Sequence, residues 1–200
     1  RDILGGGLDP SGRFFSLPAP TKNELLVFDL EEKKRVAKIA TGKNPRPDPG
    51  ARWEDPEHGW VAAISHVSDD KLLLYGIDPK KEDKAWKVVE KIPVHYSVGH
   101  LAVAGGKTRK PYGKYLISMN KLTKDTFLKH GPLETENHEL FTIGQTPAKL
   151  VDQMPLGPET HYSQAIPVSL IAKKAKLTYT DAAALPDKQP SVQYDYAAKE

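Results

Sequence analysis

Glycine and proline interrupt this chain so often that they favour strands over helices. The 200 residues include 17 prolines and 15 glycines, which separate short apolar runs. Proline cannot donate a backbone hydrogen bond inside a helix, and both residues are typical of the turns that join strands. Short strands bounded by such turns indicate an all-β fold.

One pattern of strand, polar turn and strand recurs along the chain. The strands that it predicts are Arg13–Leu17, Glu24–Leu30, Arg35–Ala40, Trp60–Val67, Lys71–Asp78, Ala85–Val94, Lys114–Met119, Glu139–Ile143, Ala148–Met154, Tyr162–Ile166 and Lys176–Tyr179. The repeated unit has roughly 45 to 55 residues, near the size of one blade of a β-propeller. We therefore predict a β-propeller with about four blades in residues 1–180 and an extended arm over 181–200.

About four blades are at the low end for a closed ring. A half ring would leave sheet edges exposed, and exposed edges promote aggregation. We therefore expect these blades to be part of a seven- or eight-bladed ring that other residues or another chain complete. A closed four-bladed ring is the alternative.

The composition argues against several classes of function. The chain has no cysteine, which excludes disulfides, iron–sulfur clusters and covalently attached c-type haem. Its net charge is only +3, with 29 basic residues spread among 26 acidic ones, so we expect no nucleic acid partner. No apolar stretch is long enough to predict a membrane span. The chain begins with neither methionine nor an apolar signal, so we expect a mature product, a processed piece or a fragment.

The stretch from Pro111 to Pro132 combines a strand with a polar insertion, Asn120–Asp125, which is too polar for a core strand. Loops on a rigid scaffold often carry binding and catalytic groups. We therefore expect this insertion to be either a site or a solvated surface loop. Further on, the acidic residues around His138, Glu139 among them, lack the ligand spacing of a known metal site.

Two parts of the chain resemble two families of periplasmic propellers. Residues 1–95 contain GGLDPSGRFF, NELLVFDLEEKKRVAKIATGKNPRP and GWVAAISHVSDDKLLLYGIDP, and resemble the haem d1 propeller of cytochrome cd1 nitrite reductases. Residues 96–180 contain VGHLAVAGG, GKYLISMNKLTKDTFLKHGPLETENHELFTI and MPLGPETHYSQ, and resemble the catalytic propeller of nitrous oxide reductase. Both resemblances imply a periplasmic location.

The resemblance to nitrous oxide reductase implies a copper enzyme that reduces N2O to N2. Its tetranuclear copper–sulfide centre is held by histidines, and His100 in VGH and His161 in THYSQ match two of these ligands. Imidazole suits copper. A lysine close to the centre would fall within residues 114–124, and Lys121 is the predicted catalytic residue. The remaining ligands would come from other blades, and electrons from a cupredoxin or a c-type cytochrome. In the alternative, His100 and His161 only form hydrogen bonds within the propeller.

The resemblance to cytochrome cd1 implies haem d1 instead. His66, in ISH, matches one of the two distal histidines that donate protons to nitrite, and is the predicted cofactor-binding residue. The place of its partner histidine reads RPDPG, with Arg46 where a histidine is expected. Arginine cannot act as a general acid at neutral pH because its pKa is too high. This replacement favours a structural role for His66.

Three functions are therefore open. The first is a part of a nitrous oxide reductase-like periplasmic copper oxidoreductase of denitrification. The second is a propeller without a cofactor that serves as a scaffold subunit in a larger nitrogen-cycle complex such as hydrazine synthase. The third is a haem d1-binding, nitrite reductase-like protein.

Overall fold

The computed structural model describes residues 5–46, 50–95, 98–104, 114–120 and 137–155. The chain divides into two compact units, Arg1–Ser163 and Gln164–Glu200, and every described residue belongs to the first. The predicted fourth blade and the C-terminal arm therefore lie outside the described residues. Within the described ranges, no helix is long and apolar enough to cross a membrane.

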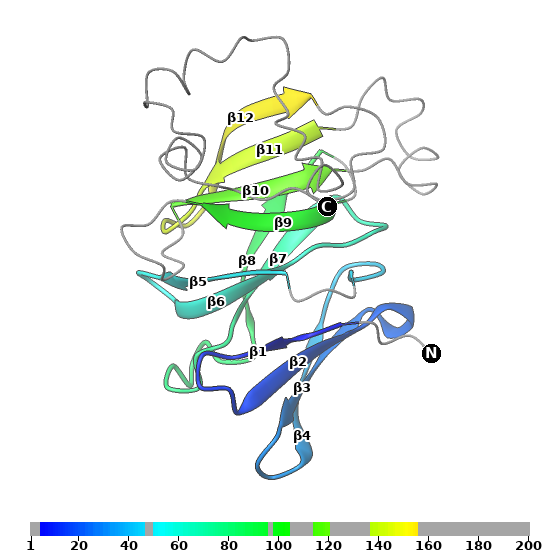
Figure 1. The fold of residues 1–200 in the computed structure, drawn as a ribbon, viewed down its shortest axis with the longest axis vertical. Coiled ribbons are helices and arrows are strands. Elements are labelled where there is room, and N and C mark those ends of the chain that lie inside the picture. Colours follow the sequence, from blue (N-terminus) through cyan, green and yellow to red (C-terminus); the bar gives the residue numbers. More distant parts are fainter. Residues whose placement is uncertain (1–4, 47–49, 96–97, 105–113, 121–136, 156–200) are drawn as a thin grey trace, which may run out of the picture. The chain divides into compact units, whose positions relative to one another are not determined.

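Three four-stranded antiparallel sheets follow one another along the chain (Figure 1). The first contains β1 (Gly7–Leu8), β2 (Phe14–Ala19), β3 (Glu24–Asp29) and β4 (Lys34–Ala40), with the 3-10 turn η1 (Pro20–Lys22) between β2 and β3. The second contains β5 (Ala51–Asp55), β6 (Gly59–Ile64), β7 (Lys71–Gly76) and β8 (Val88–Pro93). The third contains β9 (Val98–Ala104), β10 (Tyr115–Asn120), β11 (Asn137–Thr142) and β12 (Lys149–Pro155).

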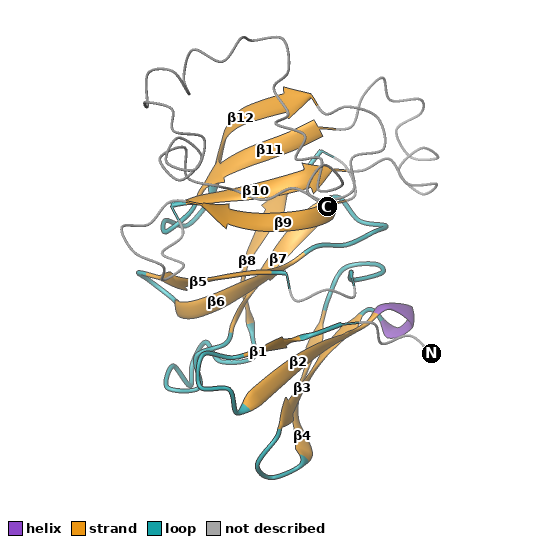
Figure 2. Ribbon diagram, in the orientation of Figure 1, coloured by secondary structure: helices purple, strands orange, loops and turns teal. Residues whose placement is uncertain are grey.

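Each sheet is a meander in which every strand pairs with the next strand of the chain. Sheets of this kind are the blades of β-propellers. The first strands begin at residues 7, 51 and 98, so the observed spacing is close to the predicted blade length. The predicted all-β fold is confirmed, and Figure 2 shows strands throughout the described part apart from the short η1.

The sequence analysis missed the first strand of every sheet. β1 has only two residues, and β5 reads ARWED, with three charged side chains in five positions. In β5, Ala51, Trp53 and Asp55 are buried while Glu54 is exposed, so the alternation of a strand is present. The charges conceal it, because sequence patterns identify strands by apolar residues.

Two boundaries were also predicted wrongly. Asn120 was assigned to the polar insertion, but it is the last residue of β10 and is fully buried. A buried carboxylate accepts a hydrogen bond from its side chain, which allows a polar residue to end a core strand. The strand predicted from Ala85 begins at Val88 instead, because Trp86 has a φ of 61°, in the left-handed region. The rest of the insertion lies outside the described residues.

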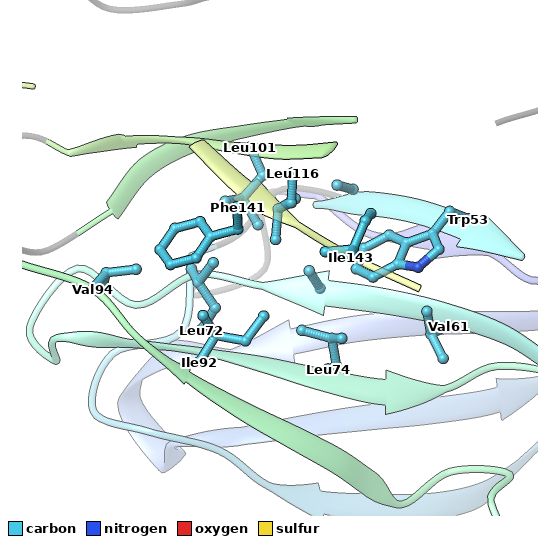
Figure 3. Close-up of a cluster of buried hydrophobic side chains, with 12 residues drawn as sticks. Trp53, Val61, Leu72, Leu74, Ile92, Val94, Leu101, Leu116, Phe141 and Ile143 are labelled. Atoms are coloured by element: carbon cyan, nitrogen blue, oxygen red, sulfur yellow. The ribbon is translucent and has the colours of Figure 1, made fainter. Parts of the chain in front are cut away.

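The second sheet is buried on both faces. A cluster that includes Trp53, Leu72 and Leu74 packs against Leu101 and Phe141 of the third sheet and its flanks (Figure 3). A separate cluster joins the first sheet to the opposite face of the second; its buried members are Leu25, Val27, Ile39, Ala62, Ile64, Leu73, Tyr75 and Ile77. Successive side chains of a strand point to opposite faces, so the run Leu72-Leu73-Leu74 serves both clusters.

The first strands of the three sheets lie next to one another. The guanidinium of Arg52, on β5, donates a hydrogen bond to the carbonyl of Leu8, on β1. On its other side, β5 contacts β9. This arrangement places His100, a residue of β9, on the side of the third sheet where the first strands gather.

We expect Leu116→Ala to lower the free energy of unfolding by about 2–5 kcal/mol, because it removes a fully buried side chain from the core between the second and third sheets. Leu150→Ala is the matched control, since Leu150 is 44% exposed; its effect should stay within about 0.5 kcal/mol. Urea denaturation measures both. Equal losses would mean that the third sheet is not packed as described.

Candidate functional site

His66 is fully buried and both of its ring nitrogens contact the backbone. Nδ1 donates to the carbonyl oxygen of Lys71 at 2.8 Å, and Nε2 accepts from the N–H of Gly42 at 2.9 Å. A neutral imidazole with its proton on Nδ1 satisfies both contacts. Gly42 permits this approach, because a Cβ at that position would lie 2.9 Å from the His66 ring. Burial lowers the pKa of His66 below its ordinary value of 6.5.

Arg46 lies beside His66, as the resemblance to cytochrome cd1 implies. The backbone N–H of Arg46 donates to the carbonyl of Ser65 at 2.9 Å, and Pro45 forms an isolated bridge with His66. With both nitrogens held by backbone groups, His66 presents neither of them to a cofactor in this conformation. These contacts fit the structural role that the sequence favoured. The role of His66 in binding haem d1 stays a prediction, and these contacts do not support it.

A polar cluster lies on the buried face of the third sheet, around Glu139 of β11, which is 1% exposed. Glu139 Oε1 lies 2.6 Å from Nδ1 of His95 and 3.0 Å from Nε2 of Gln153. Its Oε2 lies 2.8 Å from Nδ2 of Asn120 and 3.1 Å from the backbone nitrogen of His95. Donors aimed at both oxygens offset the cost of burying the carboxylate.

Strand alternation explains why Glu139 points inward. Glu139 and Phe141 are two residues apart on β11, and Phe141 belongs to the core against the second sheet. Opposite Glu139 on β10 is Ser118, whose hydroxyl donates to Oδ1 of Asn120 at 3.2 Å. The sequence signal that could have revealed this cluster is an acidic residue, Glu139, two positions before the apolar Phe141 in a strand, which places both side chains on the same buried face. The sequence analysis instead grouped Glu139 with the acidic residues around His138.

The opposite face of the third sheet carries the predicted ligand His100. Met119 of β10 is the register partner of His100 on β9 and of His138 on β11, so the three residues form one row on one face. Met119 is fully buried. Nε2 of His138 is buried and has no hydrogen-bond partner among the described residues. Burial lowers the pKa of His138 below 6.5, so its ring is neutral at neutral pH.

The structure describes only part of the predicted copper site. His100 lies on β9, and Lys121 directly follows the last residue of β10 in the chain. Lys121 and His161 lie outside the described residues, so the roles of Lys121, His100 and His161 stay predictions. In the part of the chain that the structure describes, no group of three or more His, Cys, Asp or Glu residues could hold a metal ion.

We expect the stability of His66→Gln to depend less on pH than that of the wild type. The pKa of His66 is lower in the folded state than its ordinary 6.5, so the unfolded chain takes up the proton first as the pH falls through 6.5. The stability contributed by this group is fully present above that pH. Below it, the wild type should lose up to about 1.4 kcal/mol per pH unit from this group.

Urea unfolding at about pH 7.5 and about pH 5.5 measures the difference in slope. The wild type, measured at the same two pH values, is the reference. If His66→Gln kept the pH dependence of the wild type, the buried neutral state of His66 would be contradicted.

We expect Glu139→Gln to lower the free energy of unfolding by about 1–3 kcal/mol. Glutamine has the same shape, but its NH2 group would face donors that now bind a carboxylate oxygen. Glu54→Gln makes the same change at an exposed position, and should stay within about 0.5 kcal/mol of the wild type. Urea denaturation compares the two variants, and a Glu139→Gln variant of wild-type stability would contradict the described network.

Comparisons with known proteins match the two parts of the chain separately. The Cytochrome D1 heme domain family matches residues 2–103, just over half of the chain. The nitrous oxide reductase propeller repeat matches residues 91–161. The two matches overlap at residues 91–103, which include most of β9.

The curated relatives fall into the same two groups. The nitrous-oxide reductase of Stutzerimonas stutzeri is 38% identical over 81 residues, which are 40% of this chain and 13% of that protein. The nitrous-oxide reductase of Ralstonia nicotianae is 33% identical over 98 residues, 46% of this chain and 15% of that protein. The nitrite reductase of Stutzerimonas stutzeri is 34% identical over 94 residues, 44% of this chain and 17% of that protein. The chain thus spans less than a fifth of the length of each of these relatives.

Solved structures support the fold. Dihydro-heme d1 dehydrogenase NirN has a TM-score of 0.54 at 18% identity, over 77% of this chain and 28% of that one. Kuenenia stuttgartiensis hydrazine synthase has a TM-score of 0.50 at 14% identity, over 74% of this chain and 36% of that one. At such identities the likeness shows the fold alone, and it agrees with an incomplete β-propeller. The chain belongs to the Cytochrome D1 heme domain family, and residues 91–161 match the nitrous oxide reductase propeller repeat.

Proposed function

We propose that this chain is part of a periplasmic, nitrous oxide reductase-like copper oxidoreductase of nitrogen respiration, which reduces N2O to N2. The observation that carries the proposal is the position of His100 on β9, among the first strands of the sheets. Its register partner Met119 is two residues before Lys121, the predicted catalytic residue. The propeller repeat of nitrous oxide reductase, which covers this same part of the chain, supports the assignment.

In this proposal His100 and His161 bind copper, and Lys121 places an ammonium group near it. Imidazole suits copper, and the described part of the chain holds only some of the donors that a multinuclear centre needs. The other ligands come from the chain or segment that completes the ring. When bound, the copper centre supplies the electrons for the reduction, and a cupredoxin or a c-type cytochrome is the proposed donor to it.

A second candidate is a scaffold without a cofactor in a larger periplasmic nitrogen-cycle complex, as proposed by analogy with hydrazine synthase. The observation that favours it is the state of His66, whose nitrogens bind Lys71 and Gly42. A histidine whose two ring nitrogens bind backbone groups stabilises the fold and has no free nitrogen with which to bind a ligand. For the same reason, the contacts of His66 do not support a haem d1 site.

Elemental analysis and an absorption spectrum of the natively purified protein, with any chain that co-purifies, test the proposal. We expect copper with a sulfide charge-transfer band in the wild type. Both His100→Gln and His161→Gln should lose that band, because each removes an imidazole ligand. His95→Gln should keep the charge-transfer band, since the imidazole of His95 contacts Glu139, which lies on the face of the third sheet opposite to His100. A protein that carries no copper, while its partners carry haem, would refute the copper function and favour the scaffold.

A further inference from the structure

His100, Met119 and His138 form a row across three neighbouring strands of the third sheet. Direct register partners in an antiparallel sheet have Cβ atoms about 4.5–5.5 Å apart, with both side chains on one face. Met119 stands in the middle, with one imidazole on either side. A single ion above Met119 can therefore be reached from both neighbours without any change of the backbone.

The donors of this row, two imidazoles and one thioether, select a soft metal ion. Thioether sulfur favours copper(I), whereas Mg²⁺, Ca²⁺ and Mn²⁺ prefer oxygen ligands. Zinc is bound in proteins through Cys, His, Asp and Glu. All three donors are uncharged when the imidazoles are neutral, which suits a monovalent ion better than a divalent one. The described residues contain no group of three or more His, Cys, Asp or Glu that could hold a metal ion, and this row differs in that its third donor is a methionine.

The row borders an apolar row on the same face, and one of its polar atoms has no hydrogen-bond partner among the described residues. The next row on the same face consists of Ala102, Ile117 and Leu140, each partly buried. Nε2 of His138 is buried without a hydrogen-bond partner among the described residues. A buried polar atom without a partner costs free energy, and a bound metal ion would remove that cost. By contrast, both carboxylate oxygens of Glu139, on the other face, accept from donors within the chain.

We propose that His100, Met119 and His138 form a mononuclear copper(I) site on the face of the third sheet that is turned away from the second sheet. The site goes beyond the proposed function, because it uses Met119 and His138 and lies within a single sheet. A centre of the nitrous oxide reductase type would need His161 and ligands from other blades instead. The two share His100, so variants of the unshared residues separate them.

The test is an anaerobic titration of the full chain, without a histidine tag, with copper(I) in competition with a chromophoric copper(I) chelator. We expect one copper(I) ion per chain and a copper–sulfur contribution in the X-ray absorption spectrum. Met119→Leu conserves volume, so it should fold. It should abolish the copper–sulfur contribution and weaken copper(I) binding by at least about tenfold, since loss of even an outer-shell partner costs about 10- to 100-fold. His138→Gln should weaken binding similarly.

Met154→Leu is the matched control, since Met154 is the only other methionine of the chain; it should keep the copper–sulfur contribution. Circular dichroism confirms that each variant is folded. Copper(I) binding that is unchanged in both Met119→Leu and His138→Gln overturns the proposal, as does a sulfur contribution that disappears with Met154 instead. Binding lost in His161→Gln but kept in Met119→Leu overturns the row site and leaves the proposed reductase centre intact.

Discussion

The burial of the second sheet on both faces is the constraint on which the described structure depends. Leu72 and Leu74 pack with the third sheet, while Leu73 between them packs with the first. A sheet that is apolar on both sides cannot expose either face to water without a large loss of hydrophobic free energy. Two neighbouring sheets must therefore cover it, and the stack of blades follows from this sequence.

The same packing decides where polar chemistry can lie. The buried polar residues include Asp29, His66, Asn120 and Glu139, and each has hydrogen-bond partners inside the protein. The Glu139 carboxylate takes up the donors of His95, Asn120 and Gln153, and His66 uses both nitrogens on the backbone. Groups that are satisfied in this way hold the sheets in register. Among the described residues, the atoms still able to bind a ligand are therefore the few buried nitrogen and oxygen atoms without a hydrogen-bond partner, such as Nε2 of His138.

Much of the fold could be predicted from the sequence, because the second, third and fourth strands of each sheet contain apolar residues and lie between clear turns. The first strands could not, because β1 is too short and the three charges of β5 hide its alternation. Hydrogen bonds between distant residues were equally out of reach: Gly42 binds His66 from 24 residues away. The row of His100, Met119 and His138 depends on how β9, β10 and β11 are aligned, and the positions of the histidines in the sequence do not reveal this alignment.

The place where the two family matches overlap, residues 91–103, includes most of β9, the strand with which the third sheet begins. In a repeat protein each unit contacts only its neighbours, and stability is close to a sum of units and interfaces. Blades that resemble different families can therefore lie side by side where a single apolar interface is compatible with both. The cluster between the second and third sheets is that interface in this chain. The interface between two blades is thus also the boundary between the two segments of sequence similarity.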